Sequence, residues 1–283
     1  MTGRTLILTM IAMLAFAANS LLCRFALGLH LIDAASFTSV RAVSGAITLA
    51  AIHQVRSAGG GSASSGWRAP AMLFAYMICF SFAYLSLGAG TGALILFGAV
   101  QLTMFFHALR NGEHFPAVSW AGLVLAAGGL VYLLFPGITA PDPVGSILMA
   151  VAGVSWGFYS LLGRGLDPLA ATARNFRLAA PLALVASVVF VSRFDVSASG
   201  LALAAASGAV ASGCGYVIWY AALKGLSATR AATVQLSVPA IAAIGGALLM
   251  SETLTGRLLL ASAATLGGVA IVLFQRAAAA PSH

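Results

Sequence analysis

Apolar residues in this chain gather in long continuous runs, and short polar or glycine-rich breaks separate one run from the next. The runs are roughly 20 residues long and do not alternate with polar residues, as expected of helices that cross a bilayer. A membrane β-strand would span only about ten residues and would alternate. The pattern predicts ten transmembrane helices, at about Leu6 to Phe25, Ala34 to His53, Ala69 to Leu87, Thr91 to Leu109, Ala117 to Phe135, Gly145 to Leu162, Leu169 to Val191, Leu201 to Leu223, Thr229 to Met250 and Leu258 to Phe274.

Composition agrees with this interpretation, because 61% of the residues are hydrophobic and only 7% are charged. A soluble globular domain typically has about 25% charged residues. In lipid every backbone polar group needs an internal partner, and a helix supplies one for nearly all of them. We therefore expect an all-α integral membrane protein that contacts the lipid bilayer on most sides.

The net charge of +8 does not indicate a nucleic-acid partner, because the basic residues are spread singly between apolar runs and form no patch. They indicate topology instead. Ten spans place both termini on one side, and a cytoplasmic assignment puts ten basic residues inside and four outside. Those predicted inside are Arg4, Arg56, Arg68, Arg110, Arg164, Arg174, Arg177, Lys224, Arg230 and Arg276, and those outside are Arg24, Arg41, Arg193 and Arg257.

Residues 156–164, Trp-Gly-Phe-Tyr-Ser-Leu-Leu-Gly-Arg, resemble residues 16–24, Phe-Ala-Ala-Asn-Ser-Leu-Leu-Cys-Arg. The alignment pairs Asn19 with Tyr159 and places both on a small and polar helix face. The pairing extends to Arg24 with Arg164, Arg41 with Arg177, Tyr84 with Tyr220, and Glu113 with Glu252. The chain therefore reads as two related halves of five helices each.

An odd number of helices in each half forces the second half to enter the membrane upside down. The predicted halves are residues 1–138, which include a flexible Gly/Ser-rich cytoplasmic loop at 57–66, and residues 139–283. Inverted repeats of this kind are typical of secondary transporters, whose site lies near the midplane between the halves. We expect Asn19 and Tyr159 on opposing walls of one cavity.

Uncharged polar and aromatic side chains near the midplane are the candidates for a substrate site. Aromatic rings can stack against an apolar side chain, while amides and hydroxyls orient the polar end of a substrate. The predicted substrate-binding residues are Asn19, Phe80, Tyr84, Gln101, Trp156, Tyr159, Trp219, Tyr220, Gln235 and Ser237. Tyr76, Phe80 and Tyr84 recur every fourth residue and form a stripe, although such a stripe can equally serve helix packing.

Two arginines, Arg41 and Arg177, lie inside predicted spans, where a charge is costly unless it is paired or reaches the interface. Their paired positions suggest gate or structural roles. The six acidic residues all fall at or beyond span ends, so no acid is predicted at the midplane.

The sequence indicates neither an enzyme nor a metalloprotein. It contains no HExxH, no CxxC and no GxSG with a matching buried histidine. We therefore expect no cofactor and no metal. A channel is the other rival, but the sequence has no rings of charge and no carbonyl-filter signature.

These features resemble the EamA-type members of the drug/metabolite transporter superfamily over essentially the whole chain. The residues that carry the likeness are Arg41, Arg177, Gly112-Glu113, Ser251-Glu252 and Pro239. The run at 97–104, Phe-Gly-Ala-Val-Gln-Leu-Thr-Met, together with 19–24, is similar to YddG-type exporters of aromatic amino acids. The halves differ at one point, because Gln101 stands where the second half has Pro239.

The resemblance implies a bacterial inner-membrane exporter that works by alternating access. Small multidrug exporters, which resemble half of this chain, use a glutamate in their first helix, where this sequence has Asn19. We therefore expect facilitated diffusion or weak coupling rather than strict proton exchange. The predicted substrates are aromatic and large apolar amino acids, with other small metabolites or amphipathic drugs as the alternative, and we expect a monomer.

Overall fold

Helices make up nearly all of the residues that the computed structural model describes, which are 2–56, 66–163, 166–226 and 228–279. The first half contains α1 (Gly3–Gly28), α2 (Ala34–Arg56), α3 (Arg68–Ala83), α4 (Ala89–Arg110) and α5 (Ala117–Leu134). The second contains α6 (Pro143–Leu162), α7 (Pro168–Val189), η1 (Val191–Arg193), α8 (Ala198–Ala206), η2 (Ser207–Cys214), α9 (Gly215–Leu223), α10 (Ala228–Gln235), α11 (Ser237–Met250) and α12 (Gly256–Ala279).

These elements form ten helical segments in the described part of the chain, because α8, η2 and α9 run on as one helix and α10 continues into α11. Eight of the ten are long and apolar enough to cross a membrane by length and composition. The others are α3, which has only 16 residues, and α7, whose first half carries Arg174, Asn175 and Arg177. The predicted all-α membrane fold of ten helices is confirmed. Arg164 and most of the predicted 57–66 loop lie outside the described residues.

Two helices begin in the same way, with an aspartate followed by a proline. The Asp142 carboxylate accepts a hydrogen bond from the Gly145 amide at 2.6 Å, and that of Asp167 accepts one from the Ala170 amide at 2.7 Å. The proline that follows sits at the first helical position, where its missing N–H costs nothing. The sequence thus fixes the starts of α6 and α7 locally.

The ninth span, predicted as one helix, is interrupted between Gln235 and Ser237. Pro239 is the physical cause. Its ring collides with the carbonyl of the residue four positions earlier, which is Gln235, and it has no N–H to bond that carbonyl. The break leaves Gln235 at the end of a short helix in the middle of the bundle.

The eighth span also departs from a regular helix, because η2 is wound as a π-helix between α8 and α9. Its sequence, Ser-Gly-Ala-Val-Ala-Ser-Gly-Cys, consists mostly of small residues. Gly208 of η2 lies against the backbone of Arg41 in α2, where even a Cβ atom would collide. The wider winding therefore lets η2 pack directly against α2; π-helical turns are often found at functional sites.

The third helix is shorter than predicted and ends at Ala83 instead of Leu87. The amide of Tyr84 hydrogen bonds to the carbonyls of both Phe80 and Ser81, which tightens and closes the last turn. Gly88, in an extended conformation, is the N-cap residue of α4. Tyr84 therefore lies just beyond the end of α3, with its ring still next to that of Phe80.

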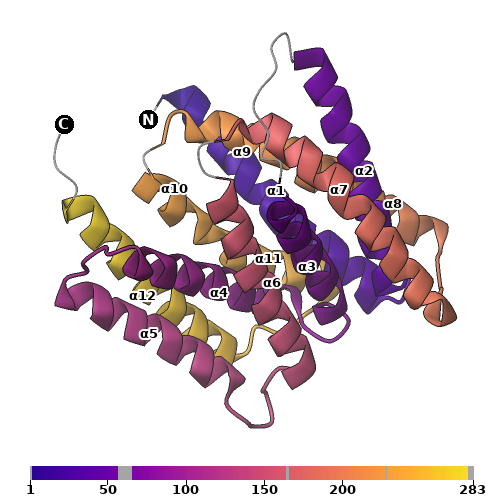
Figure 1. Ribbon diagram of the computed structural model, residues 1–283. Helices are drawn as coiled ribbons and strands as arrows, with labels where there is room; N and C mark the ends of the chain where they lie inside the picture. The colour runs from indigo at the N-terminus through magenta and orange to yellow at the C-terminus, as the bar shows by residue number, and fades with distance from the viewer. Residues whose placement is uncertain (1, 57–65, 164–165, 227, 280–283) are drawn as a thin grey trace.

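Helices that the two predicted halves place in equivalent positions pack against each other: α2 with α7, α4 with α11, and α5 with α12. Two further contacts are related by the same equivalence of the halves: α1 packs on the α8–η2–α9 helix, and its counterpart α6 packs on α3. In Figure 1, α2, α7 and α8 form one flank, α5 and α12 form the other, and α1, α3, α6 and α11 lie between them. This arrangement is what an inverted repeat would produce, but the division at residues 138 and 139 stays a prediction.

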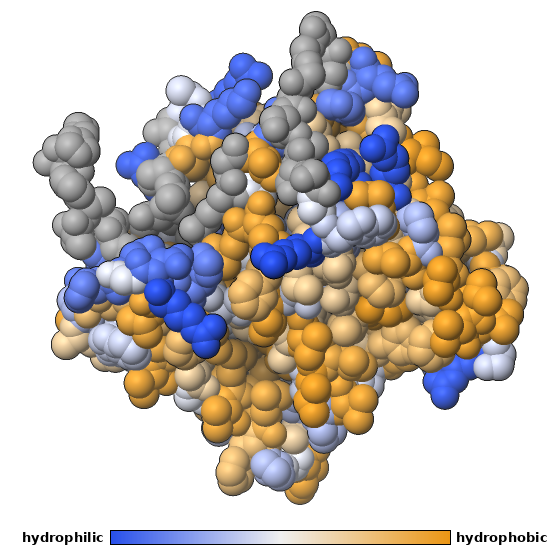
Figure 2. Space-filling view, viewed as in Figure 1, coloured by the Kyte–Doolittle hydropathy of each residue, from blue (hydrophilic) through white to orange (hydrophobic). Residues whose placement is uncertain are grey.

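The two ends of the bundle are distinct. The end of the bundle that carries the start of α1 and the end of α12 is called the near end, and the opposite end is called the far end. Large apolar side chains face outward between the ends, as lipid contact requires; Val188 is 72% exposed and Leu248 is 78% exposed. Figure 2 shows apolar residues covering most of the visible face, with hydrophilic ones gathered mainly towards the near end.

Close backbone contact between α5 and α12 gives a stability prediction. A Cβ atom on Gly268 would lie 2.5 Å from the Ala126 nitrogen and would also collide with the Gly122 carbonyl oxygen, whereas one on Gly267 would meet nothing within 4 Å. We expect Gly268→Ala to destabilise the protein by about 2 kcal/mol. The adjacent Gly267→Ala should leave stability nearly unchanged. Thermal unfolding in detergent measures the difference, and equal melting temperatures for the two variants would contradict the packing described.

Candidate functional site

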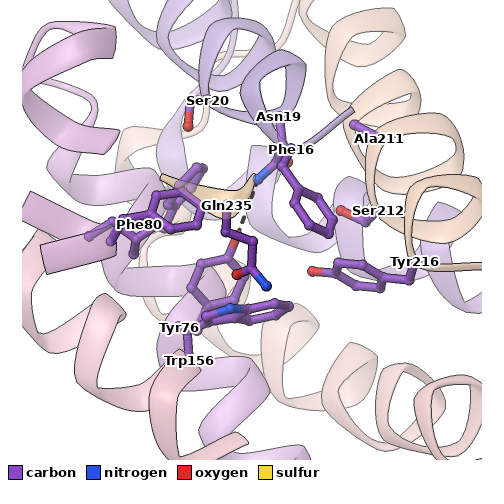
Figure 3. A pocket seen from close by; sticks show the side chains of 12 residues that line it. Phe16, Asn19, Ser20, Tyr76, Phe80, Trp156, Ala211, Ser212, Tyr216 and Gln235 are labelled. Atoms are coloured by element: carbon purple, nitrogen blue, oxygen red, sulfur yellow. Dashed lines mark hydrogen bonds between the residues drawn. The ribbon is translucent and has the colours of Figure 1, made fainter. Parts of the chain in front are cut away.

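A cavity lies in the middle of the bundle and consists of two adjoining chambers. The smaller one, the deep chamber, has a volume of about 30 Å³ and lies among α1, α3, α4, α6, η2, α9 and α10. Its lining comprises Phe16, Asn19, Ser20, Tyr76, Phe80, Leu96, Phe97, Trp156, Ala211, Ser212, Tyr216 and Gln235 (Figure 3). The larger one, the outer chamber, has a volume of about 330 Å³. Phe16, Trp156, Tyr216 and Gln235 line both chambers.

The outer chamber leads from mid-bundle to the near end. Its remaining lining residues are Met104, Tyr159, Ser160, Gly163, Leu166, Pro168, Ala171, Thr172, Asn175, Trp219, Tyr220 and Leu223. Among these, Gly163 and Pro168 are exposed at the connection between α6 and α7. The cavity therefore reaches the surface at the near end.

Trp156 is the centre of an aromatic cluster that separates the two chambers. Its ring centroid lies 4.8 Å from that of Tyr76, 5.3 Å from that of Tyr159 and 5.5 Å from that of Tyr216. On the opposite side, Phe16 contacts both Tyr216 and Trp219, at 6.0 and 5.8 Å. These tilted and edge arrangements are favourable for aromatic rings and leave ring surface for a flat or apolar ligand.

Polar groups form a continuous chain at the bottom of the deep chamber. The Ser207 hydroxyl donates to the Asn19 side-chain oxygen at 2.7 Å, and the Asn19 amide donates to the Tyr76 hydroxyl at 3.1 Å. The Arg41 guanidinium donates to the same hydroxyl at 2.8 Å. These groups are shielded from water, so a broken hydrogen bond could not be replaced by one to solvent. The hydrogen-bond network therefore fixes the side chains of Tyr76 and Asn19 in place.

Seven of the ten predicted substrate-binding residues line the two chambers. They are Asn19, Phe80, Trp156, Tyr159, Trp219, Tyr220 and Gln235. Asn19 and Tyr159, expected on opposing walls of one cavity, line different chambers, one deep and one outer. Gln101 instead lines a third space, a side chamber of about 420 Å³ that adjoins the outer chamber at Gln235 and Trp219.

Tyr84 and Ser237 do not line these chambers. Tyr84 is wholly buried, and its hydroxyl donates to the Ala89 carbonyl at 3.4 Å. The Ser237 side chain is exposed and donates to the Val234 carbonyl at 2.6 Å. The ring of Tyr84 packs edge-to-face against the ring of Phe80. It therefore closes the cavity beyond Phe80, towards the far end, instead of lining it.

The two predicted intramembrane arginines are not equivalent in position. Arg41 is completely buried directly behind Tyr76 and Phe80, 5.0 and 5.1 Å from their ring centroids. Arg177 is exposed on α7. Their roles as gate or structural residues stay predictions.

Several lining residues were missing from the predicted set. Tyr216 contacts both Trp156 and Phe16, and its position four residues before Tyr220 on the same helix was the available signal. Phe16 is the counterpart of Trp156 in the repeated segment, so the repeat itself pointed to it. Ser212, in the π-helical segment, offered no such signal.

Beyond Tyr84, an ion pair links the helices at the far end of the bundle and lines a separate hollow of about 300 Å³. The Arg24 Nε lies 2.8 Å from the Glu252 Oε1, and the Arg24 guanidinium also donates to the Tyr84 carbonyl at 3.1 Å. The other Glu252 oxygen accepts a hydrogen bond from the Ala89 amide at 2.8 Å. These bonds tie α1, the start of α4 and the α11–α12 connection together below Tyr84, and neither chamber is lined by Arg24 or Glu252.

Comparison with known proteins places this fold in a family. Residues 143–274 match the model of the EamA-like transporter family. The chain is similar to an uncharacterized protein of Pseudomonas aeruginosa, with 51% identity over 274 residues and coverage of 96% of both chains. A crystal structure described only as that of a protein has the same fold, with a TM-score of 0.67, 19% identity and coverage of 94% of this chain and 97% of that one.

Proposed function

Because the chain belongs to the EamA-like transporter family, a family of membrane transporters and not of enzymes, we propose that it exports aromatic and large apolar amino acids by alternating access. The observation that carries this proposal is the aromatic cluster around Trp156, placed where the deep chamber meets the outer chamber that reaches the near end. Rings of Phe16, Tyr216 and Trp219 extend that surface.

Alternating access requires a substrate site that reaches only one side at a time. In the proposed orientation both termini are cytoplasmic, so the outer chamber opens to the cytoplasm of a bacterial cell and the Arg24–Glu252 pair closes the outside. Residues 1–138 and 139–283 would then be the two inverted halves, and their relative movement would carry the substrate across the inner membrane. A single chain encloses the cavity, which favours a monomer.

Efflux from liposomes tests the substrate. Liposomes that contain the purified protein and are loaded with labelled phenylalanine, tryptophan or methionine should lose label faster than liposomes without protein. Label loss at the same rate from both would refute amino acid export for this chain. Loading with lysine in parallel provides a control, because a charged side chain has no partner on the aromatic walls.

One observation favours a second class of substrate. The side chamber is mostly apolar, lies beside the outer chamber, and is lined by Leu102, Phe105 and Val272 among other residues. A larger amphipathic drug or metabolite could place part of its surface there. Efflux of such a compound without efflux of phenylalanine would favour this alternative.

Transport is expected to depend only weakly on a pH gradient. Among the described residues, no acidic side chain lines the deep or the outer chamber, and Glu113, at the near-end mouth of the side chamber, is exposed. Proton-coupled carriers usually place an ionisable group along the pathway. Reversing the gradient across the liposome membrane should therefore change phenylalanine flux by less than about twofold. Flux that stops without the gradient would show strict coupling.

A further inference from the structure

Arg41 carries a buried charge for which the described side chains supply no opposite charge. Within the described residues, the Arg41 guanidinium makes one hydrogen bond, which it donates to the Tyr76 hydroxyl. Its Nε and its second terminal nitrogen have no hydrogen-bond partner among these residues. The ion pair that the described residues do form, Arg24–Glu252, lies at the far end. The rings of Tyr76 and Phe80 give the guanidinium some stabilisation but no negative charge.

A cation in this position is expensive for the protein. Removing a charge from water without an opposite charge costs far more than burying a neutral polar group, and charges inside membrane proteins usually mark substrate or ion pathways. Tyr76, which receives the hydrogen bond from Arg41, lines the deep chamber. The missing negative charge can therefore come from a group bound in that chamber.

Two hydroxyl groups of the deep chamber have a proton free to donate. The Tyr76 oxygen already accepts hydrogen bonds from Asn19 and from Arg41, so its own proton remains to be donated. Ser212 is 1% exposed and lines the chamber, and its hydroxyl has no partner within the described residues. Figure 3 shows the Ser212 and Tyr216 hydroxyls turned inward, on the side of the pocket across from Tyr76 and Gln235. These hydroxyl groups can donate to an anion, and the positive charge of Arg41 behind Tyr76 favours an anion over an ammonium group.

The size of the deep chamber limits what it can hold. Its volume of about 30 Å³ has room for roughly two water-sized groups, whereas the outer chamber of about 330 Å³ has room for a side chain. A carboxylate has two oxygens and fits the smaller space. The aromatic cluster around Trp156 lies where the two chambers meet, so it can pack against the apolar part of the same molecule.

We propose that the deep chamber is a carboxylate subsite, in which Tyr76 and Ser212 donate hydrogen bonds to the substrate carboxylate and Arg41 supplies the balancing charge from behind Tyr76. This inference rests on the proposed transport function and narrows it. The substrates are carboxylates with an aromatic or apolar body, and an ammonium group is not needed for binding. Aromatic amines without a carboxylate are excluded.

Binding of four phenylalanine-like compounds to the purified protein tests this directly. The compounds are phenylalanine, 3-phenylpropionate, which lacks the ammonium group, phenylalaninamide and phenethylamine, which both lack the carboxylate. Isothermal titration should give phenylalanine and 3-phenylpropionate at least about tenfold higher affinity than the other two, as the loss of a hydrogen bond to a charged group predicts. Equal affinities, or no binding by either carboxylate, would overturn the proposal.

Arginine variants separate a role in selectivity from a role in folding. Arg41→Met should remove the preference for 3-phenylpropionate over phenethylamine, and Arg41→Lys should keep most of it because the charge remains. Arg177→Met, which alters the exposed arginine at the predicted equivalent position, should leave the preference intact. If Arg41→Met does not fold, Tyr76→Phe removes the donated proton and should reduce the same preference. A preference unchanged in folded Arg41→Met or Tyr76→Phe would contradict the assignment.

The anion at this position could also be chloride, and one further comparison distinguishes the two. Replacing chloride by isethionate, an anion that carries no carboxylate, should leave the affinity for 3-phenylpropionate unchanged or raise it, because chloride would compete for the same donors. An affinity that requires chloride would assign the subsite to that ion instead. If the protein binds 3-phenylpropionate but does not transport phenylalanine, the carboxylate subsite is supported and amino acid export is rejected. If it transports phenylalanine but binds all four compounds equally, amino acid export is supported and the carboxylate subsite is rejected.

Discussion

Replacing Trp156 by alanine is expected to reduce phenylalanine transport by about tenfold or more at matched protein levels. The substitution removes the ring that contacts Tyr76, Tyr159 and Tyr216 and that lines both chambers. The substrate would lose its stacking surface, and the neighbouring rings would lose the contact that holds them. Initial rates of efflux from liposomes measure the effect.

Trp120→Ala is the matched control for that variant. Trp120 is 41% exposed on α5, contacts Phe105 at 5.5 Å and lines neither chamber. It should retain nearly the full rate. Equal losses in the two variants would mean that tryptophan contributes through stability and that the aromatic cluster is not the substrate surface.

The second large effect is expected at the far end, where Glu252→Gln should make the deep chamber accessible from outside. The substitution keeps the shape of the side chain but removes the charge that pairs with Arg24, while Tyr84 loses part of its support. Because both side chains are partly exposed, at 23% and 18%, the pair should contribute no more than about 1 kcal/mol, or roughly fivefold in population.

Thiol labelling measures this opening. In a variant without native cysteines, Ser20→Cys places one thiol in the deep chamber. An impermeant maleimide added to spheroplasts should label it about fivefold faster when Glu252→Gln is also present. Asp195→Asn, which removes an exposed acid at the same end, should not change the rate. The exchanged pair Arg24→Glu with Glu252→Arg should partly restore slow labelling, and a failure of Glu252→Gln to speed it would show that the ion pair does not hold the far end closed.

The helices of this protein could be predicted well because lipid demands long apolar segments, and the ten predicted spans correspond to ten segments in the described chain. Their interruptions could be predicted less well. Pro239 was visible in the sequence, but a proline does not always break a helix: α7 continues through Pro181. The π-helical winding of η2 follows from packing against α2 around Gly208, which local sequence does not encode.

The sequence predicted the types of residue that line the site, but not which way each side chain faces. In a membrane helix both the lipid-facing and the core-facing sides are apolar, so hydrophobic periodicity does not tell which side faces a cavity. Tyr76 and Tyr84 look alike in the sequence, but Tyr76 lines the deep chamber and Tyr84 closes the space below it. Tyr216 was missed because the repeat directed attention to Tyr220. The buried position of Arg41 behind Tyr76 depends on the packing of α2 with α3 and with η2, and η2 is distant from α2 in the sequence.

The expected roles of the Arg24–Glu252 pair and of the aromatic cluster both depend on one claim, that a single site is exposed to the two sides of the membrane in turn. Counterflow tests it most directly. Liposomes that contain the protein and are preloaded with unlabelled tryptophan should take up labelled phenylalanine to a transient excess over the outside concentration, and the initial rate should saturate as phenylalanine is raised. Uptake that is linear in concentration and indifferent to the preload would indicate a pore, and no uptake above protein-free liposomes would contradict amino acid transport altogether.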